Sequence, residues 1–237
     1  MKSNRRLNWL DLFRWAFSDI LGKTYSSEDK SHFYDRMAFD FFHRDRLAKY
    51  MVDTIQGLFP TGQAYVAERA AGSGIVTKEL YERGYTNIRA TDLSESQLKV
   101  LEEKLKGIEV KVENLNGEMD GVKDNSVDII FQVGATRFMT RKGQETYISE
   151  AARTLKNGAY VLWPVMWVER PLAWTMHGFR SPKTTSFAIA SLLSKHGLNV
   201  VSAPKLIHGK MGLLTTTLLV IQKQEKSQQK SWFSAGL

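Results

Sequence analysis

The sequence predicts an α/β fold: a doubly wound, mostly parallel sheet of seven strands that ends in an antiparallel hairpin. From residue 64 onward, short apolar segments alternate with helix-type segments, as in parallel sheets with crossover helices. The last two strand-type segments are separated by only about ten residues, which favours an antiparallel connection over a crossover. The chain has 237 residues, of which 43% are hydrophobic, so one domain can bury a full core.

Each element follows from a local pattern. Helices are expected where apolar residues recur every three or four positions, and strands where short apolar runs lie between turn residues. Ser94, followed by Gln97 three residues later, predicts a capping box at the start of one helix. The expected helices are 7–22, 39–58, 75–83, 94–106, 142–155 and 186–196, and the expected strands are 64–68, 87–91, 109–112, 127–133, 159–165, 198–202 and 213–222.

Composition excludes several classes of protein. The chain has no cysteine, which removes disulfides, thiolate metal sites and cysteine nucleophiles. No run of 18 apolar residues is present, and the basic start is interrupted by acids, so neither a membrane span nor a signal peptide is expected. We therefore expect a cytoplasmic location.

The turn after the first strand is the expected ligand site, because ligands of open α/β sheets bind at the carboxyl ends of strands. Small residues (Ala70, Gly72, Gly74) permit close approach of a ligand, and Asp92 ends the second strand, where an acid can hold ribose hydroxyls. Thr77 stands where the dinucleotide fingerprint requires its third glycine, and no GxxxxGK[ST] motif is present. This pattern suits an adenosine ligand without a pyrophosphate, such as S-adenosylmethionine.

Four motifs, in order, resemble those of class I S-adenosylmethionine-dependent methyltransferases. They read VAERAAGSG (66–74), ATDLS (90–94), NGEMDGVKDNSVDII (116–130) and EAARTLKNG (150–158). The nearest groups are the ubiquinone/menaquinone-biosynthesis type and related small-molecule methyltransferases. The resemblance implies a Rossmann-like sheet over one domain, with a helical lid (1–58), a cofactor-binding core (64–165), a substrate-covering segment (166–197), a terminal hairpin (198–222) and a mobile tail (225–237).

The resemblance also implies the roles of individual residues. Glu68 would organise the turn near the methionine amino group, Asp92 would take the ribose hydroxyls, and Leu93 would pack on the adenine. The remaining cofactor residues would be Tyr34, Ala70, Gly72, Gly74, Asn116, Gly117, Glu118, Gln132 and Val133. Two positions depart from the family pattern: Ala70 replaces a glycine, which is tolerable only at negative φ, and Asn116 replaces an acid.

The expected acceptor is a small, apolar or aromatic metabolite that is methylated on O, N or C. Gln132-Val133-Gly134-Ala135 follows the fourth strand in place of a [DNS]-P-P-[YFW] motif, and no carboxylate set suggests a metal. His177, His32 and His43 are the candidate acid–base residues, and Arg137 could pair with an acidic substrate.

Three alternatives remain open from the sequence. The altered turn also suits an enzyme that binds S-adenosylmethionine for a cyclisation or rearrangement. Seven basic and no acidic residues between 170 and 224, in a chain of net charge +8, leave room for a nucleic-acid methyltransferase, although their spacing disfavours nucleic acid. Trp9, Phe13, Trp15 and Phe17 leave room for peripheral membrane contact, and the oligomeric state is open.

Overall fold

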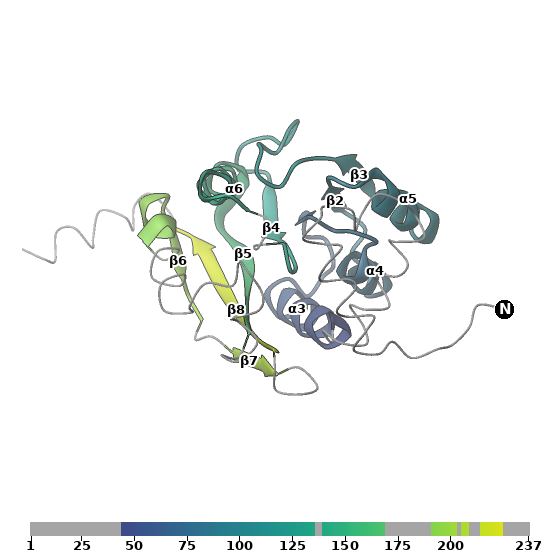
Figure 1. Ribbon diagram of the computed structural model, residues 1–237, viewed down its shortest axis with the longest axis horizontal. Coiled ribbons are helices and arrows are strands. Elements are labelled where there is room, and N and C mark those ends of the chain that lie inside the picture. The colour runs from purple at the N-terminus through teal and green to yellow at the C-terminus, as the bar shows by residue number, and fades with distance from the viewer. Residues whose placement is uncertain (1–43, 136–138, 169–190, 203–204, 209–213, 225–237) are drawn as a thin grey trace, which may run out of the picture.

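The computed structural model describes residues 44–135, 139–168, 191–202, 205–208 and 214–224. The expected helix 7–22, the segment 169–190 and the tail 225–237 lie outside these residues. The described part forms one mixed sheet with helices on both faces (Figure 1). This agrees with the doubly wound architecture that the sequence predicts.

The sheet has the strand order β3-β2-β1-β4-β5-β8-β6. The strands are β1 (Val66–Arg69), β2 (Ile88–Asp92), β3 (Glu109–Val112), β4 (Val127–Phe131), β5 (Leu155–Val168), β6 (Leu198–Val200), β7 (Lys205–His208) and β8 (Leu214–Lys223). Strands β1 to β5 pair in parallel, and β8 runs antiparallel to β5, β6 and β7. The order reverses between β1 and β4, which is the place where doubly wound sheets bind ligands.

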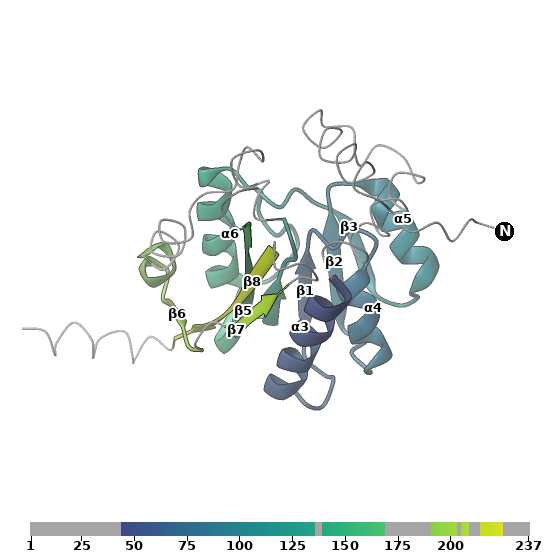
Figure 2. The same cartoon turned by 60° about the horizontal axis from the view of Figure 1, so that its bottom comes forward.

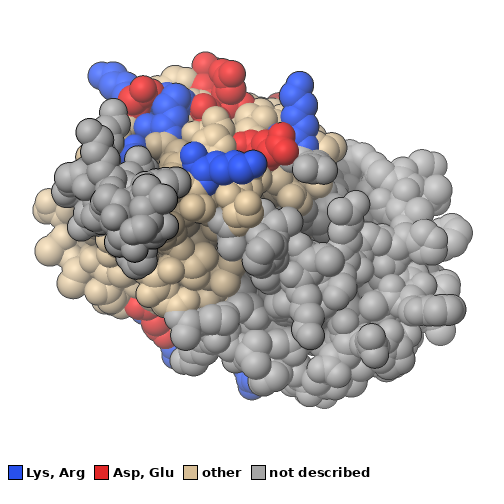
Figure 3. Space-filling model, turned by 90° about the vertical axis from the view of Figure 1, so that its left-hand side faces the viewer, with Lys and Arg blue, Asp and Glu red and all other residues tan. Residues whose placement is uncertain are grey.

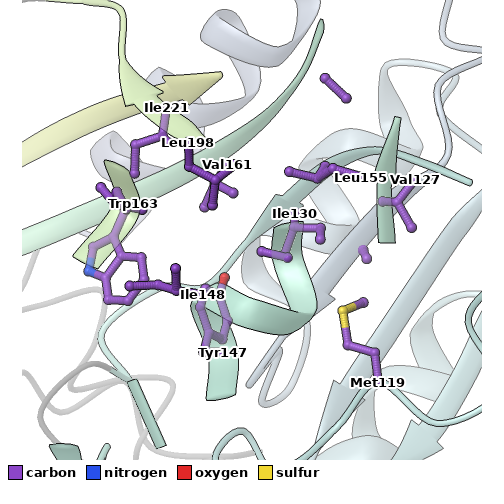
Figure 4. Close-up of a cluster of buried hydrophobic side chains, with 14 of the residues drawn as sticks. Met119, Val127, Ile130, Tyr147, Ile148, Leu155, Val161, Trp163, Leu198 and Ile221 are labelled. Carbon is purple, nitrogen blue, oxygen red and sulfur yellow. The ribbon is translucent and has the colours of Figure 1, made fainter. Parts of the chain in front are cut away.

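Helices cover the two faces unequally. The described helices are α3 (Arg44–Leu58), α4 (Ile75–Glu82), α5 (Glu95–Lys104) and α6 (Arg141–Thr154). Helices α3 and α4 share a buried cluster with alternate residues of β1, β4 and β5, whereas α6 packs against the opposite face (Figures 1 and 2). The α6 side of the core includes Tyr147 and Trp163, whose rings meet edge to face at 5.0 Å (Figure 4).

Side-chain alternation places the last residues of β1 on opposite faces. Val66 belongs to the α3/α4 cluster and Ala67 to the α6 cluster, so Glu68 and Arg69 continue the same alternation. The Glu68 carboxylate accepts a hydrogen bond from the Thr77 hydroxyl of α4, which agrees with this placement. The carboxyl end of β1 thus carries an acid on one face and a base on the other.

The hairpin at the end of the chain differs in one detail from its prediction. Strand β8 pairs with β5 along one edge, and its other edge is shared by β6 near Ile221 and β7 near Thr217. The seventh position of the sheet is therefore filled by two short strands, so the sheet counts eight strands rather than seven.

Candidate functional site

The turn between β1 and α4 is built from three residues in the left-handed backbone region. Ala70 has φ 60°, Gly72 58° and Gly74 79°. The amides of Ala71, Gly72 and Gly74 donate to the Thr91 carbonyl, the Asp92 carboxylate and the Ala71 carbonyl, respectively. These three amides already have acceptors inside the protein, so they are not the groups that would bind a ligand. What the turn offers a ligand is room to approach the backbone closely.

Gly74 is fixed by its surroundings as well as by its dihedral angle. It is the N-cap of α4, and a Cβ at this position would overlap Cδ1 of Leu101 from α5. Only glycine therefore allows α5 to lie against the start of α4. The small residue seen in the sequence is needed for packing in addition to any ligand.

Ala70 has a strained backbone conformation, which the sequence analysis expected only if its φ were positive. Its φ of 60° is left-handed, so the methyl group that replaces the usual glycine hydrogen is unfavourable here. The negative φ that would have made alanine tolerable is not found.

Asp92 connects the ends of β2 and β1. One carboxylate oxygen accepts the Gly72 amide at 2.8 Å, and the other accepts the Ser94 amide, also at 2.8 Å. A carboxylate is an acceptor with about four lone-pair positions, and the Asp92 side chain is partly exposed at the end of β2. Asp92 and Gly72, predicted independently as site residues, thus lie in direct contact.

Only one of the two hydrogen bonds of the predicted capping box of α5 forms. Ser94 accepts from the Gln97 amide as expected, but the Ser94 amide is already taken by Asp92. The Gln97 side chain instead lies with its Oε1 3.6 Å from where a Cβ of Gly72 would be, and within the described chain both of its polar atoms lack a hydrogen-bond partner. The S-x-x-Q pattern could not reveal this, because the competing acceptor is Asp92.

Asn116 and Gly117 lie in a hydrogen-bonded turn after β3. The Gly117 amide donates to the Asn114 carbonyl at 2.9 Å, and the Asn116 amide donates to the Asn114 side chain at 2.9 Å. The Asn116 side-chain oxygen accepts the Thr140 amide at 3.1 Å, which fastens the turn to the start of α6. This use of the side chain was not anticipated by its assignment to the adenine edge.

The remaining predicted cofactor residues differ in exposure. Leu93, beside Asp92, is 68% exposed, which is unusual for leucine and leaves an apolar surface at the end of β2. Gln132 is fully buried after β4, where its side-chain oxygen accepts the Ala135 amide at 2.9 Å. Val133 is buried and Glu118 is exposed.

Arg69 is a buried charge that the sequence analysis missed. It is 1% exposed, and burial lowers the pKa of its guanidinium from the ordinary value. An arginine between Glu68 and Ala70 offers no spacing signal, so only the structure identifies its environment. The predicted residues Tyr34, His32, His43, Arg137 and His177 lie outside the described part of the chain.

The described geometry gathers one set of groups at the carboxyl edge of β1 and β2. These are the Asp92 carboxylate, the glycine turn and the exposed Leu93 side chain. An acceptor-only carboxylate suits a diol, the turn suits a closely approaching polar chain, and the leucine suits a flat apolar ring. A nucleoside with a small polar extension satisfies all three.

Comparisons with known proteins agree with this description. Residues 66–158 match a family model described as a methyltransferase domain. A search of curated proteins finds no significant match. Many solved structures resemble this chain.

Three of the similar structures define the fold. An S-adenosylmethionine-dependent methyltransferase from Methanosarcina mazei superposes with a TM-score of 0.56 at 20% identity, covering 72% of this chain and 98% of the other. A TehB-like methyltransferase from Corynebacterium glutamicum gives 0.51 at 14% identity, with 71% and 85% covered. A geranyl diphosphate methyltransferase solved with S-adenosylmethionine gives 0.60 at 11% identity, with 81% and 90% covered.

The chain has the fold of S-adenosylmethionine-dependent methyltransferases. The residues that match the family model span the strands and turns that carry Glu68, Asp92 and Asn116. The family match over residues 66–158 and the structural likeness agree on this fold. In the described part of the chain, no helix is long and apolar enough to cross a bilayer.

Proposed function

We propose that this protein binds S-adenosylmethionine at the carboxyl ends of β1 and β2 and transfers its methyl group to a small metabolite. The observation that carries the proposal is the Asp92 carboxylate, which lies on the Gly72 amide at 2.8 Å and so joins the two elements that would hold the nucleoside. We further propose that the whole chain works as one methyltransferase domain, with the segments 1–58 and 166–197 covering the substrate.

The described residues fit this cofactor. Asp92, held at the end of β2 by the Gly72 and Ser94 amides, would receive the ribose hydroxyls. Leu93, exposed at the end of β2, would lie against the adenine, and Glu68 would hold the turn near the methionine amino group. Gln132 and Val133 would face the methionine moiety from the end of β4, and Asn116, Gly117 and Glu118 would border the adenine.

A small-molecule acceptor is favoured over nucleic acid. The similar structures include a geranyl diphosphate methyltransferase and one described as a sarcosine dimethylglycine methyltransferase. On the face shown in Figure 3, the described charged side chains gather mostly at one rim, with both signs interspersed. A groove that follows a phosphate backbone requires a stripe of one sign instead.

Ligand binding tests the first half of the proposal. Isothermal titration calorimetry with S-adenosylhomocysteine should detect one site, and Asp92→Asn should weaken binding by about tenfold because a hydroxyl contact loses its charged acceptor. Glu102→Gln, an exposed carboxylate on α5, is the matched control and should bind as the wild type does. Absence of heat with the wild-type protein would refute the proposal.

Label transfer tests the second half. The protein is incubated with methyl-labelled S-adenosylmethionine and a panel of small aromatic and apolar metabolites, and products are followed by mass spectrometry. Transfer of the label supports methylation. A changed product without label would instead indicate a cyclisation or rearrangement, and transfer only to added RNA or DNA would indicate a nucleic-acid substrate.

A further inference from the structure

Arg69 lies buried at the end of β1, and burial outweighs the charges around it in lowering its pKa. Among the described residues it forms no ion pair with a carboxylate, and its Nε and Nη1 groups have no hydrogen-bond partner. The guanidinium carbon lies 5.3 Å from the centre of the Tyr147 ring, whose hydroxyl is also unpartnered within the described chain. Burying a charge in this way costs free energy that an apolar side chain would not cost.

The neighbouring aromatic residues that the structure describes give Arg69 a cation–π contact with the Tyr147 ring but no hydrogen-bond acceptor. The Trp163 indole nitrogen, which Figure 4 shows on the side of its ring away from Tyr147, is only a donor and cannot accept from a guanidinium. Glu113 and Glu150 act on Arg69 only through their charge, which raises its pKa against the larger effect of burial. Ion pairing therefore does not explain why the position holds an arginine.

The contacts that Arg69 does make converge on one turn. Its Nη2 group donates to the Asn114 carbonyl at 3.1 Å and to the Gly117 carbonyl at 3.0 Å. These are the first and last residues of the turn that the Gly117 amide closes by donating to Asn114. A single nitrogen thus holds both ends of the turn against the end of β1.

The same turn positions residues on its outer side. Asn116 lies inside it and reaches the Thr140 amide at the start of α6, where a Cβ on Gly143 would overlap the Asn116 side chain. The turn is therefore bonded to β1 through Arg69 and to the start of α6 through Asn116. Gly117 is the last residue of this turn, and Glu118 comes directly after it.

We infer that Arg69 is a positioning residue for adenine recognition: it fixes the turn 114–117 so that Asn116, Gly117 and Glu118 meet the edge of the base. The inference rests on the proposed function, because these three residues border the adenine only if the chain binds S-adenosylmethionine. It explains an otherwise unfavourable buried arginine, since Met or Leu would fill the same volume without reaching two carbonyls.

Discrimination between two bases tests the inference. S-adenosylhomocysteine and S-inosylhomocysteine differ at the edge of the base, where an amino group is replaced by an oxo group. Arg69→Met should weaken binding of the adenosyl ligand by about tenfold, the effect of one lost hydrogen bond, and should weaken the inosyl ligand less, so that the ratio of the two dissociation constants falls. Arg69→Lys, which keeps the charge but not the fork of donors, should fall between Arg69→Met and the wild type.

The matched control is Arg153→Met. Arg153 also donates to carbonyls of the chain between β3 and β4, at Val122 (2.9 Å) and Met119 (3.4 Å), but away from the turn 114–117. Arg153→Met should lower the thermal midpoint and leave the ratio of the adenosyl and inosyl dissociation constants unchanged. An unchanged ratio in Arg69→Met, with the wild type binding normally, would overturn the inference, whereas a wild type that binds neither ligand would overturn the proposed function.

Hydrogen exchange in the wild type covers the case in which Arg69→Met does not fold. If Arg69 fixes the turn, the Asn116 and Gly117 amides should exchange slowly before any ligand is added, and S-adenosylhomocysteine should slow them little further. Rapid exchange that becomes slow only with ligand would show that the ligand, rather than Arg69, orders the turn.

Discussion

Replacing Ala70 by glycine should stabilise the protein. Ala70 has φ 60°, and a left-handed conformation costs an ordinary L-residue about 1–2 kcal/mol. Glycine removes this cost but gives the unfolded chain more freedom, which takes back about 0.4–1 kcal/mol. The net gain is about 0.5–1 kcal/mol, and for a chain of this length it corresponds to a rise in Tm of about 1–4 °C.

The neighbouring alanine provides the control for this prediction. Ala71 is not among the residues with positive φ, and it is 9% exposed within the α5 cluster of Leu98 and Leu101. Ala71→Gly should therefore lower stability by about 1–2 kcal/mol, through a lost buried methyl group and added chain freedom. Thermal and urea unfolding measure both variants, and a fall in Tm for Ala70→Gly would refute the argument from backbone strain.

Three further predictions concern the same region. Gly74→Ala should lower the free energy of unfolding by more than about 2 kcal/mol, because strain at φ 79° adds to overlap with Leu101. Gly107→Ala, at φ 81° in open space, should lower it by only about 1 kcal/mol, and equal urea midpoints for the two variants would contradict the overlap. Gln97→Met should raise Tm, with a gain of about 1 kcal/mol, because it removes two buried polar atoms that lack partners in the described chain, and a lower Tm would show that the amide is satisfied. Hydrogen bonds from Arg153 lower the pKa of Glu150 below its ordinary 4.5, so the contribution of Glu150 to stability is present above that value and is lost as pH falls further. Glu150→Gln should therefore flatten the dependence of Tm on pH between about pH 6 and pH 3. Parallel curves for the variant and the wild type would refute this.

The fold could be predicted largely because its signals are local. The segments around β1 to β4 show apolar strand patterns bounded by turn residues, and their ends fall within about two residues of the expected positions. Strand β5 begins four residues earlier than expected, at Leu155, because a register irregularity between Val127 and Ile129 lets the chain join the sheet before Gly158. That irregularity depends on pairing with β4 and leaves no pattern in the local sequence.

The candidate site was predicted less completely because its side chains compete for the same hydrogen-bond partners. Asp92 and the glycine turn were found from spacing along the chain, and the structure places them in contact. The contact with Ser94 removes the partner that Gln97 would have had, and Asn116 turns to Thr140. Arg69 meets carbonyls 45 and 48 residues away, a relation that only the folded chain creates.

Opposite placement of Glu68 and Arg69 makes the end of β1 intolerant of insertion. Adding one residue to the strand would rotate every later side chain to the other face of the sheet. The guanidinium would then meet the Thr77 hydroxyl, and the carboxylate would lose that donor and enter the apolar layer beside Tyr147. A two-residue insertion preserves the facing of both groups, so insertion scanning along this strand should alternate between inactive and tolerated lengths.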